Sequence, residues 1–135
     1  MFGNKPSKPQ NRIDSLIGAG TRIEGNVVFT GGLRVDGEVK GDVVAVSDQP
    51  STVVVSEQAR IEGEVRVTHM VINGTVVGQV HASEFLELQP RCRVTGDIHY
   101  TNLEIQLGAV VDGRLVHAAA SGEGKAIELK LAKGN

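Results

Sequence analysis

The chain has 135 residues, a formal net charge of −2 and an aromatic content of only 3%, with no tryptophan. A chain of this length is expected to form one domain, and the near-neutral charge gives no electrostatic reason to expect nucleic acid as a partner. The single cysteine excludes an internal disulfide and a cysteine-only metal site. No segment has the length of a membrane span and the N-terminus lacks the apolar stretch of a signal peptide, so we expect a cytoplasmic protein.

Residues 1–12 are predicted to be a disordered tail, because they combine two prolines and several cations with almost no bulky apolar side chains. The tail nevertheless begins Met1-Phe2 and carries Lys5 and Lys8, a combination that suits weak contact with an anionic membrane surface. One such tail would bind reversibly, whereas many tails mounted on a polymer would act together. The alternative is an ordinary solubilising tail, and the residues leave both interpretations open.

A motif centred on glycine recurs six times between residues 13 and 120. Its central glycines are Gly25, Gly41, Gly63, Gly78, Gly96 and Gly113. The residue two before each glycine is β-branched, the residue two after it is aliphatic, the residue directly after it is polar, and the residue four before it is small. The copies lie about 17 to 18 residues apart on average, which is typical of a solenoid of short strands. The sequence therefore predicts an all-β fold, a single-stranded parallel β-helix of about six triangular coils over residues 13–120.

The aligned columns predict where each type of residue lies in the coil. The β-branched and aliphatic residues are expected to fill the bore, the polar ones to face water, and Gly and other small residues to occupy the corners. Ser47–Ser51 interrupts the longest interval between glycines and is expected to bulge at a corner. Residues 121–135 are predicted to be a flexible tail. Because Ile127, Leu129 and Leu131 alternate with polar residues there, a strand added to the last coil is the open alternative.

Histidines spaced at the coil period are the first candidates for chemistry. His81 and His99 share one column, and stacked imidazoles on neighbouring coils could in principle bind a metal. His117 falls one position out of the column, however, and no acid shares it. A solvent-facing ladder is therefore the better interpretation, and no metal site is predicted.

Cys92 and a column of acids are the other candidates. Cys92 lies between two arginines that would lower the pKa of a thiol, yet the other copies have Thr, Gly or Ala in its column, so it is interpreted as a small corner residue. The column of Glu24, Glu62 and Asp112 has no partner with a defined role in acid–base catalysis. The sequence predicts no catalytic residues and no cofactor.

The two ends of the predicted β-helix carry more information than its flanks. A β-helix that stays monomeric normally covers its open ends with polar repeats or a helix, and no such capping sequence is evident here. We therefore expect end-to-end self-association, with folding of the tails over the ends as the alternative. The residues predicted to take part are Ile17, Ile23, Val27 and Phe29 at the N-terminal end, and Leu103, Ile105, Val111 and Leu115 at the C-terminal end.

Two segments of this repeat resemble bactofilins, the polymer-forming cytoskeletal proteins of bacteria. Ile13–Gly25 is similar to the opening of that family, and Val94–Tyr100 with Leu103–Gly113 is similar to its closing coils. The resemblance covers residues 13–116. It implies a right-handed triangular β-helix, and non-polar filaments made without nucleotide by head-to-head and tail-to-tail stacking.

The resemblance also implies a cellular role. Family members are typically scaffolds at the cytoplasmic face of the inner membrane that position cell-wall or cell-shape proteins, and some carry a membrane-binding motif with Met-Phe and nearby lysines at the extreme N-terminus. We accordingly expect a cytoplasmic or peripheral membrane scaffold whose main partner is itself. A monomeric β-helix binding module and an acyltransferase-like β-helix enzyme are the alternatives.

Overall fold

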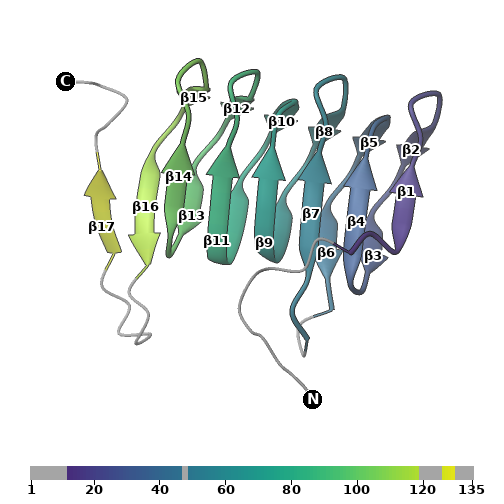
Figure 1. Cartoon of the computed structure of the whole chain (residues 1–135), viewed down its shortest axis with the longest axis horizontal. Helices are drawn as coiled ribbons and strands as arrows, with labels where there is room; N and C mark the ends of the chain where they lie inside the picture. Colours follow the sequence, from purple (N-terminus) through teal and green to yellow (C-terminus); the bar gives the residue numbers. More distant parts are fainter. Residues whose placement is uncertain (1–11, 47–48, 119–125, 130–135) are drawn as a thin grey trace.

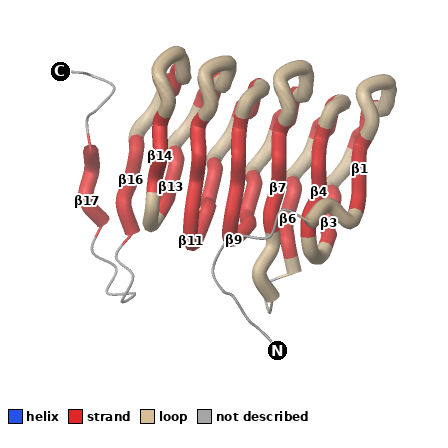
Figure 2. The backbone as a smooth tube through the Cα atoms, in the orientation of Figure 1, coloured by secondary structure: helices blue, strands red, loops and turns tan. Residues whose placement is uncertain are grey.

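The computed structural model describes residues 12–46, 49–118 and 126–129, and these form a solenoid of about six coils (Figure 1). Short strands stack along its long axis, and none of the described residues forms a helix (Figure 2). In particular, there is no helix among them that is long and apolar enough to cross a membrane. The predicted all-β parallel solenoid is confirmed.

The solenoid has three faces, here called the first, second and third face, and the strands of successive coils stack on each of them. The first face contains β1 (Ser15–Ile17), β4 (Gly32–Val35), β7 (Thr52–Val55), the second halves of β9 (Val65–Ile72) and β11 (Val80–Leu88), and β14 (Leu103–Ile105). The second face contains β2 (Arg22–Glu24), β5 (Glu38–Lys40), β8 (Arg60–Glu62), β10 (Thr75–Val77), β12 (Arg93–Thr95) and β15 (Val110–Asp112). The third face contains β3 (Val27–Phe29), β6 (Val43–Ala45), the first halves of β9 and β11, β13 (Ile98–Tyr100), β16 (Leu115–Ala118) and β17 (Ala126–Leu129).

The strand register reproduces the columns read from the sequence. On the second face the aligned residues are Ile23, Val39, Ile61, Val76, Val94 and Val111. In the four inner coils these side chains are almost completely buried, as are the aliphatic residues two positions after each glycine. Burial of β-branched side chains on a pleated surface is favourable because their restricted rotamers suit stacked strands. The predicted apolar bore is confirmed.

The small column ends a tight turn between the first and second faces. The backbone N–H of Ala59 donates to the carbonyl of Ser56, and the N–H of Cys92 donates in the same way to the carbonyl of Gln89. Ala59 and Cys92 are both buried at this corner, so a large side chain would have no room there. The assignment of Cys92 as a small corner residue is confirmed.

The glycine column forms the corner between the second and third faces. Gly78 adopts a φ of 146°, and a Cβ atom placed on it would lie 2.1 Å from the carbonyl oxygen of Gly63. The backbone of one coil thus rests directly on the next at this corner, which only glycine permits.

The polar column after the glycines does more than face water. The side-chain oxygen of Asn26 accepts the backbone N–H of Asp42 at 2.8 Å, and Asp42 in turn accepts the N–H of Glu64 at 2.9 Å. Asp97 repeats the contact with the N–H of Arg114 at 3.1 Å. These side chains join one coil to the next at a corner where the strands have ended.

The long interval between β6 and β7 is a corner insertion, because both strands pair with their neighbours on either side of it. Residues 47–48 lie outside the described residues. Ser51 is buried, and its backbone N–H donates to Oγ1 of Thr68 at 2.7 Å while that hydroxyl donates to the carbonyl of Ser51 at 2.6 Å. Ser51, the last residue of the predicted corner bulge, is therefore held to the next coil by two hydrogen bonds with Thr68.

Beyond the sixth coil, β17 pairs antiparallel with β16, with Leu129 opposite Leu115 and Ala126 opposite Ala118. This corresponds to the added strand that the sequence left open for the C-terminal segment. Residues 1–11, 119–125 and 130–135 lie outside the described residues, and with them the proposed membrane contacts Met1, Phe2, Lys5 and Lys8.

Candidate assembly surfaces at the ends of the solenoid

The N-terminal end of the solenoid presents three edge strands, β1, β2 and β3. In a parallel ladder alternate residues bond to the same neighbour, so the bonds that coil one makes to coil two identify which groups face outward. The N–H of Glu38 donates to the carbonyl of Thr21, and the N–H of Gly25 donates to the carbonyl of Lys40. The backbone groups of Arg22 and Glu24 therefore point away from the second coil.

The same alternation identifies the outward groups on the other two edge strands. The N–H of Val27 and the carbonyl of Phe29 both bond to the second coil, so the backbone of Val28 faces outward. The carbonyl of Ile17 also bonds inward, which leaves the backbone of Leu16 facing outward. Edge groups that bond to no described strand are a template for pairing with another chain.

The structure separates the four N-terminal residues predicted to mediate assembly. Ile17 and Phe29 are buried in the core, whereas Ile23 and Val27 are partly buried and pack against it. All four point into the bore, so each presents only a small part of its side chain at this end.

Sequence reasoning missed the two most exposed apolar side chains at this end. Leu16 is 59% exposed and Val28 is 68% exposed, on the outer surfaces of the first and third faces. Between them on the second face, Nη2 of Arg22 lies 3.1 Å from Oε2 of Glu24. The period-2 pattern placed Leu16 and Val28 outside the bore, and an apolar residue at an outward position of a terminal strand was the signal that could have found them.

The C-terminal end is less uniform than the N-terminal end. Ile105 is 41% exposed, and Leu103 and Val111 are partly buried against the core. Leu115 is only 2% exposed, and its strand pairs with β17. The open part of this end is therefore formed by the first and second faces.

Two exposed apolar residues near this end were also missed. Leu107 is 93% exposed at a corner, and Val110 is 48% exposed on the outer side of β15. Neither lies in an inward column, so the repeat gave no reason to select them.

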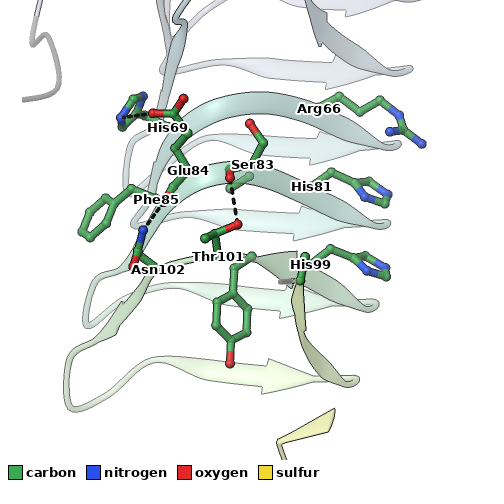
Figure 3. A pocket seen from close by; sticks show the side chains of 12 residues that line it. Arg66, His69, His81, Ser83, Glu84, Phe85, His99, Thr101 and Asn102 are labelled. Atoms are coloured by element: carbon green, nitrogen blue, oxygen red, sulfur yellow. Dashed lines mark hydrogen bonds and ion pairs between the residues drawn. The ribbon is translucent and has the colours of Figure 1, made fainter. Parts of the chain in front are cut away.

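A groove of about 900 Å³ lies along the corner between the third and first faces (Figure 3). Arg66, His81 and His99 stack along one side of it, and His69, Phe85 and Asn102 line the other (Figure 3). The rings of His81 and His99 are 4.4 Å apart between centroids and within 5° of parallel, which confirms the predicted ladder.

The electrostatics of the ladder favour a neutral His81. Burial lowers the pKa of His81, and the positive charge of Arg66 and the neighbouring His99 lower it further, while Glu64 acts in the opposite direction. Oε2 of Glu64 lies 2.7 Å from Nη2 of Arg66 and 3.2 Å from Nε2 of His81. These are ion-pair distances without hydrogen-bond alignment, because neither Oε2 of Glu64 nor Nε2 of His81 has a hydrogen-bond partner in the described coils.

His117 lies opposite Tyr100, one position out of the ladder, as its spacing indicates. Across the residues that the structure describes, no three His, Cys, Asp or Glu side chains are arranged to hold a metal ion. Two members of the acidic column, Glu24 and Glu62, form ion pairs instead. Oε2 of Glu62 lies 2.6 Å from Nε of Arg60, and this hydrogen bond lowers the pKa of Glu62.

Cys92 lacks the low pKa of a reactive thiol. Burial raises the pKa of Cys92 to about 11, although two arginines flank it in the sequence. The thiolate needed for nucleophilic attack is thus disfavoured at neutral pH.

Comparison with known proteins identifies what this solenoid is similar to. The family model described as "Bactofilin: Polymer-forming cytoskeletal" matches residues 15–116. The chain is 28% identical over 109 residues to Bactofilin BacP of Myxococcus xanthus (strain DK1622), and the match covers 81% of this chain but only 44% of BacP. It is also 28% identical over 102 residues to Bactofilin BacO of the same organism, covering 76% of this chain and 78% of BacO.

A solved structure has the same architecture. It is a cryo-EM reconstruction of double helical filaments of Thermus thermophilus bactofilin, with a TM-score of 0.64 and 28% sequence identity. The similarity covers 75% of this chain and 98% of the other chain. The likeness thus extends over nearly all of the chain in that reconstruction.

Proposed function

The chain belongs to the bactofilin family of polymer-forming cytoskeletal proteins, which is non-enzymatic, and from this premise we propose that it assembles without nucleotide into non-polar filaments. Whole β-helices would stack end to end, head to head and tail to tail. The relative from Thermus thermophilus forms double helical filaments, which supports filament formation by a solenoid of this kind.

The observation that carries the proposal is that, among the described residues, no strand covers the first coil or the first and second faces of the last coil. The first coil has outward backbone groups on all three faces, and the apolar residues of the last coil, such as Ile105, are exposed on the first and second faces. Each new copy would continue the sheets and cover the bore, so that hydrogen bonding and burial of apolar area favour the same contact.

The side chains at the ends favour non-polar over head-to-tail stacking. A copy added in the same direction would place Asp112 of β15 over Glu24 of β2, and Glu104 of β14 over Leu16 of β1. The first pair joins like charges, and the second places a charge against an apolar side chain.

The proposed setting is the cytoplasmic face of the inner membrane, where the filament would localise cell-shape or cell-wall proteins. The combination of Met1, Phe2, Lys5 and Lys8 supports it, because one aromatic side chain with nearby cations binds an anionic surface weakly and a polymer repeats the contact many times. Co-sedimentation with anionic liposomes tests this part. The full chain should sediment and Phe2→Glu should not, whereas equal sedimentation of the two would exclude Phe2 as the anchor.

Negative-stain microscopy of the purified chain without nucleotide tests assembly itself. Filaments whose width equals that of one or two solenoids are expected. Monomers would instead support a β-helix binding module, and short closed oligomers would support an architecture of the acyltransferase type.

A further inference from the structure

Contact between two N-terminal ends has a geometry that follows from symmetry. Two copies meeting at identical ends are related by a two-fold axis perpendicular to the solenoid, and this rotation reverses the strand direction. The edge strands of the two copies therefore pair antiparallel. The axis can cross any one of the three faces. That face then pairs with the same face of the partner copy, and each of the other two faces pairs with the partner's opposite one of the two.

The backbone permits all three choices. An antiparallel ladder needs residues whose N–H and C=O groups face each other, and the outward groups at this end belong to Leu16, Arg22, Glu24 and Val28. Each choice of axis brings outward groups together, so the backbone alone does not select one of them.

The side chains select one choice. If the axis crosses the second face through Ile23, then β2 pairs with β2 of the partner, and Arg22 lies opposite the partner's Glu24 on both sides of the axis. The same rotation pairs β1 with the partner's β3, and Leu16 lies opposite the partner's Val28. Each charged side chain then lies opposite a side chain of opposite charge, and each exposed apolar side chain lies opposite another apolar one. The inward residues Ile17 and Val27 extend the apolar bore into the partner copy.

The other two positions of the axis lose these matched contacts. With the axis through the first face, Leu16 meets its own copy and β2 pairs with β3, so that Arg22 or Glu24 lies opposite Val28. With the axis through the third face, Val28 meets its own copy and Leu16 lies opposite Arg22 or Glu24. Each would place one of the two most exposed apolar side chains of this end against a charge.

We propose that the N-terminal ends of two copies pair with the two-fold axis through Ile23, and that Arg22–Glu24 and Leu16–Val28 are the contacts that fix this register. The inference rests on the proposed head-to-head stacking and adds its axis and its specificity-determining residues. Arg22-Ile23-Glu24 is a self-complementary charge pattern, because two antiparallel copies of it place an arginine opposite a glutamate on each side of Ile23.

Cysteine cross-linking tests the axis. Hydrogen-bonded antiparallel pairs place Cα atoms about 5.5 Å apart, which is within the range of a disulfide. A mixture of Leu16→Cys and Val28→Cys chains should form cross-linked dimers on oxidation or with a short thiol cross-linker, whereas neither variant should do so alone. The native Cys92 does not compete, because it is buried.

The outcomes separate this inference from the filament proposal. Dimers in Leu16→Cys alone would place the axis on the first face, and dimers in Val28→Cys alone would place it on the third, so either result overturns the register. If filaments form but no sample cross-links, the register is wrong while filament formation stands. If the wild-type chain forms neither filaments nor end-to-end dimers, the filament proposal itself fails.

Charge reversal tests the specificity. In Arg22→Glu, a glutamate would face a glutamate of the partner on both sides of the axis, and in Glu24→Arg an arginine would face an arginine. Each variant alone should therefore raise the protein concentration needed for assembly about tenfold in low-salt buffer. An equimolar mixture should recover assembly, because one chain then carries only acids and the other only cations at this contact. Any effect of a substitution within its own chain, against the second coil, is the same in the mixture as in the variant alone. Recovery of assembly on mixing therefore reports the contact between copies. No recovery on mixing would overturn the assignment.

Discussion

The carbonyl oxygen of Gly63 lies 2.1 Å from the position that a Cβ atom on Gly78 would occupy. Contact this close is excluded for any side chain, and Gly78 also has a φ of 146°. Gly78→Ala is therefore expected to lower the free energy of unfolding by about 3 kcal/mol or more, from the sum of steric overlap and backbone strain. Chemical denaturation followed by circular dichroism measures this change.

Gly20→Ala provides the matched control. Nothing lies within 4 Å of a Cβ atom on Gly20, so this variant should unfold at nearly the wild-type midpoint. Equal midpoints for Gly78→Ala and Gly20→Ala would show that the glycine corner yields without strain, contrary to the stacked backbone described above.

Asp42 is expected to stabilise the junction between the second and third coils. Its Oδ1 accepts the N–H of Glu64 at 2.9 Å, beyond the end of the strand ladder. Asp42→Ala should cost about 1 kcal/mol, the usual net value of one hydrogen bond, whereas Asp42→Asn keeps the acceptor and should retain most of the stability. Faster amide exchange at Glu64 in Asp42→Ala would identify the bond, and an equal loss in both variants would point to charge instead.

The histidine ladder should make stability depend on pH. The pKa of His81 in the folded chain is below its ordinary value of 6.5, because burial and then the charges of Arg66 and His99 oppose its protonation. The unfolded chain consequently binds more protons as pH falls below that value, so His81 reduces stability progressively from about pH 7 downward. Above this window the residue should have no pH-dependent effect.

His81→Gln removes this titration and serves as the comparison. Relative to the variant, the wild-type chain should lose stability between about pH 7 and pH 5, and the difference should be constant above pH 7.5. Thermal unfolding of both chains across this range measures it. If the wild-type chain instead gained stability relative to the variant as the pH fell, the effect would have the wrong sign and would mean that Glu64 dominates the environment of His81.

Ile105 should be sensitive to charge at the C-terminal end. It is an inward residue that is 41% exposed because no described strand covers its side of the last coil. Ile105→Glu is expected to fragment filaments by preventing tail-to-tail contact, with little change in the unfolding of the isolated chain. Gln58→Glu, an exposed corner change in the middle of the solenoid, should leave filament length unchanged in electron micrographs. Filaments of normal length in Ile105→Glu would remove this residue from the contact.

Much of the fold could be predicted because the repeat assigns positions six times over. Inward residues such as Ile61 and Val76 recur in fixed columns, and each copy checks the others. The role of Asp42 could not be predicted in this way, since a polar residue at a corner looks the same in the sequence whether it faces water or accepts an N–H of the next coil. That distinction depends on the distance between coils.

The candidate assembly residues were predicted less completely for a similar reason. Periodicity distinguishes inside from outside, and it selected bore residues such as Ile17 and Leu115. It does not say which backbone groups of a terminal strand are already bonded, nor that β17 pairs with the strand of Leu115. Leu16 and Val28 become notable only when the outward edge of the first coil is known.

The strands run around the solenoid axis, and their hydrogen bonds therefore run along it. A pull along the axis loads the three faces of one coil together, whereas successive coils carry the same load one after another. The weakest junction thus sets the strength of the whole rod. Within a chain each junction is also bridged by the covalent backbone, but between chains it is not. A stretched polymer of this protein should therefore release intact subunits before any coil unwinds, and broken ends could rejoin without refolding.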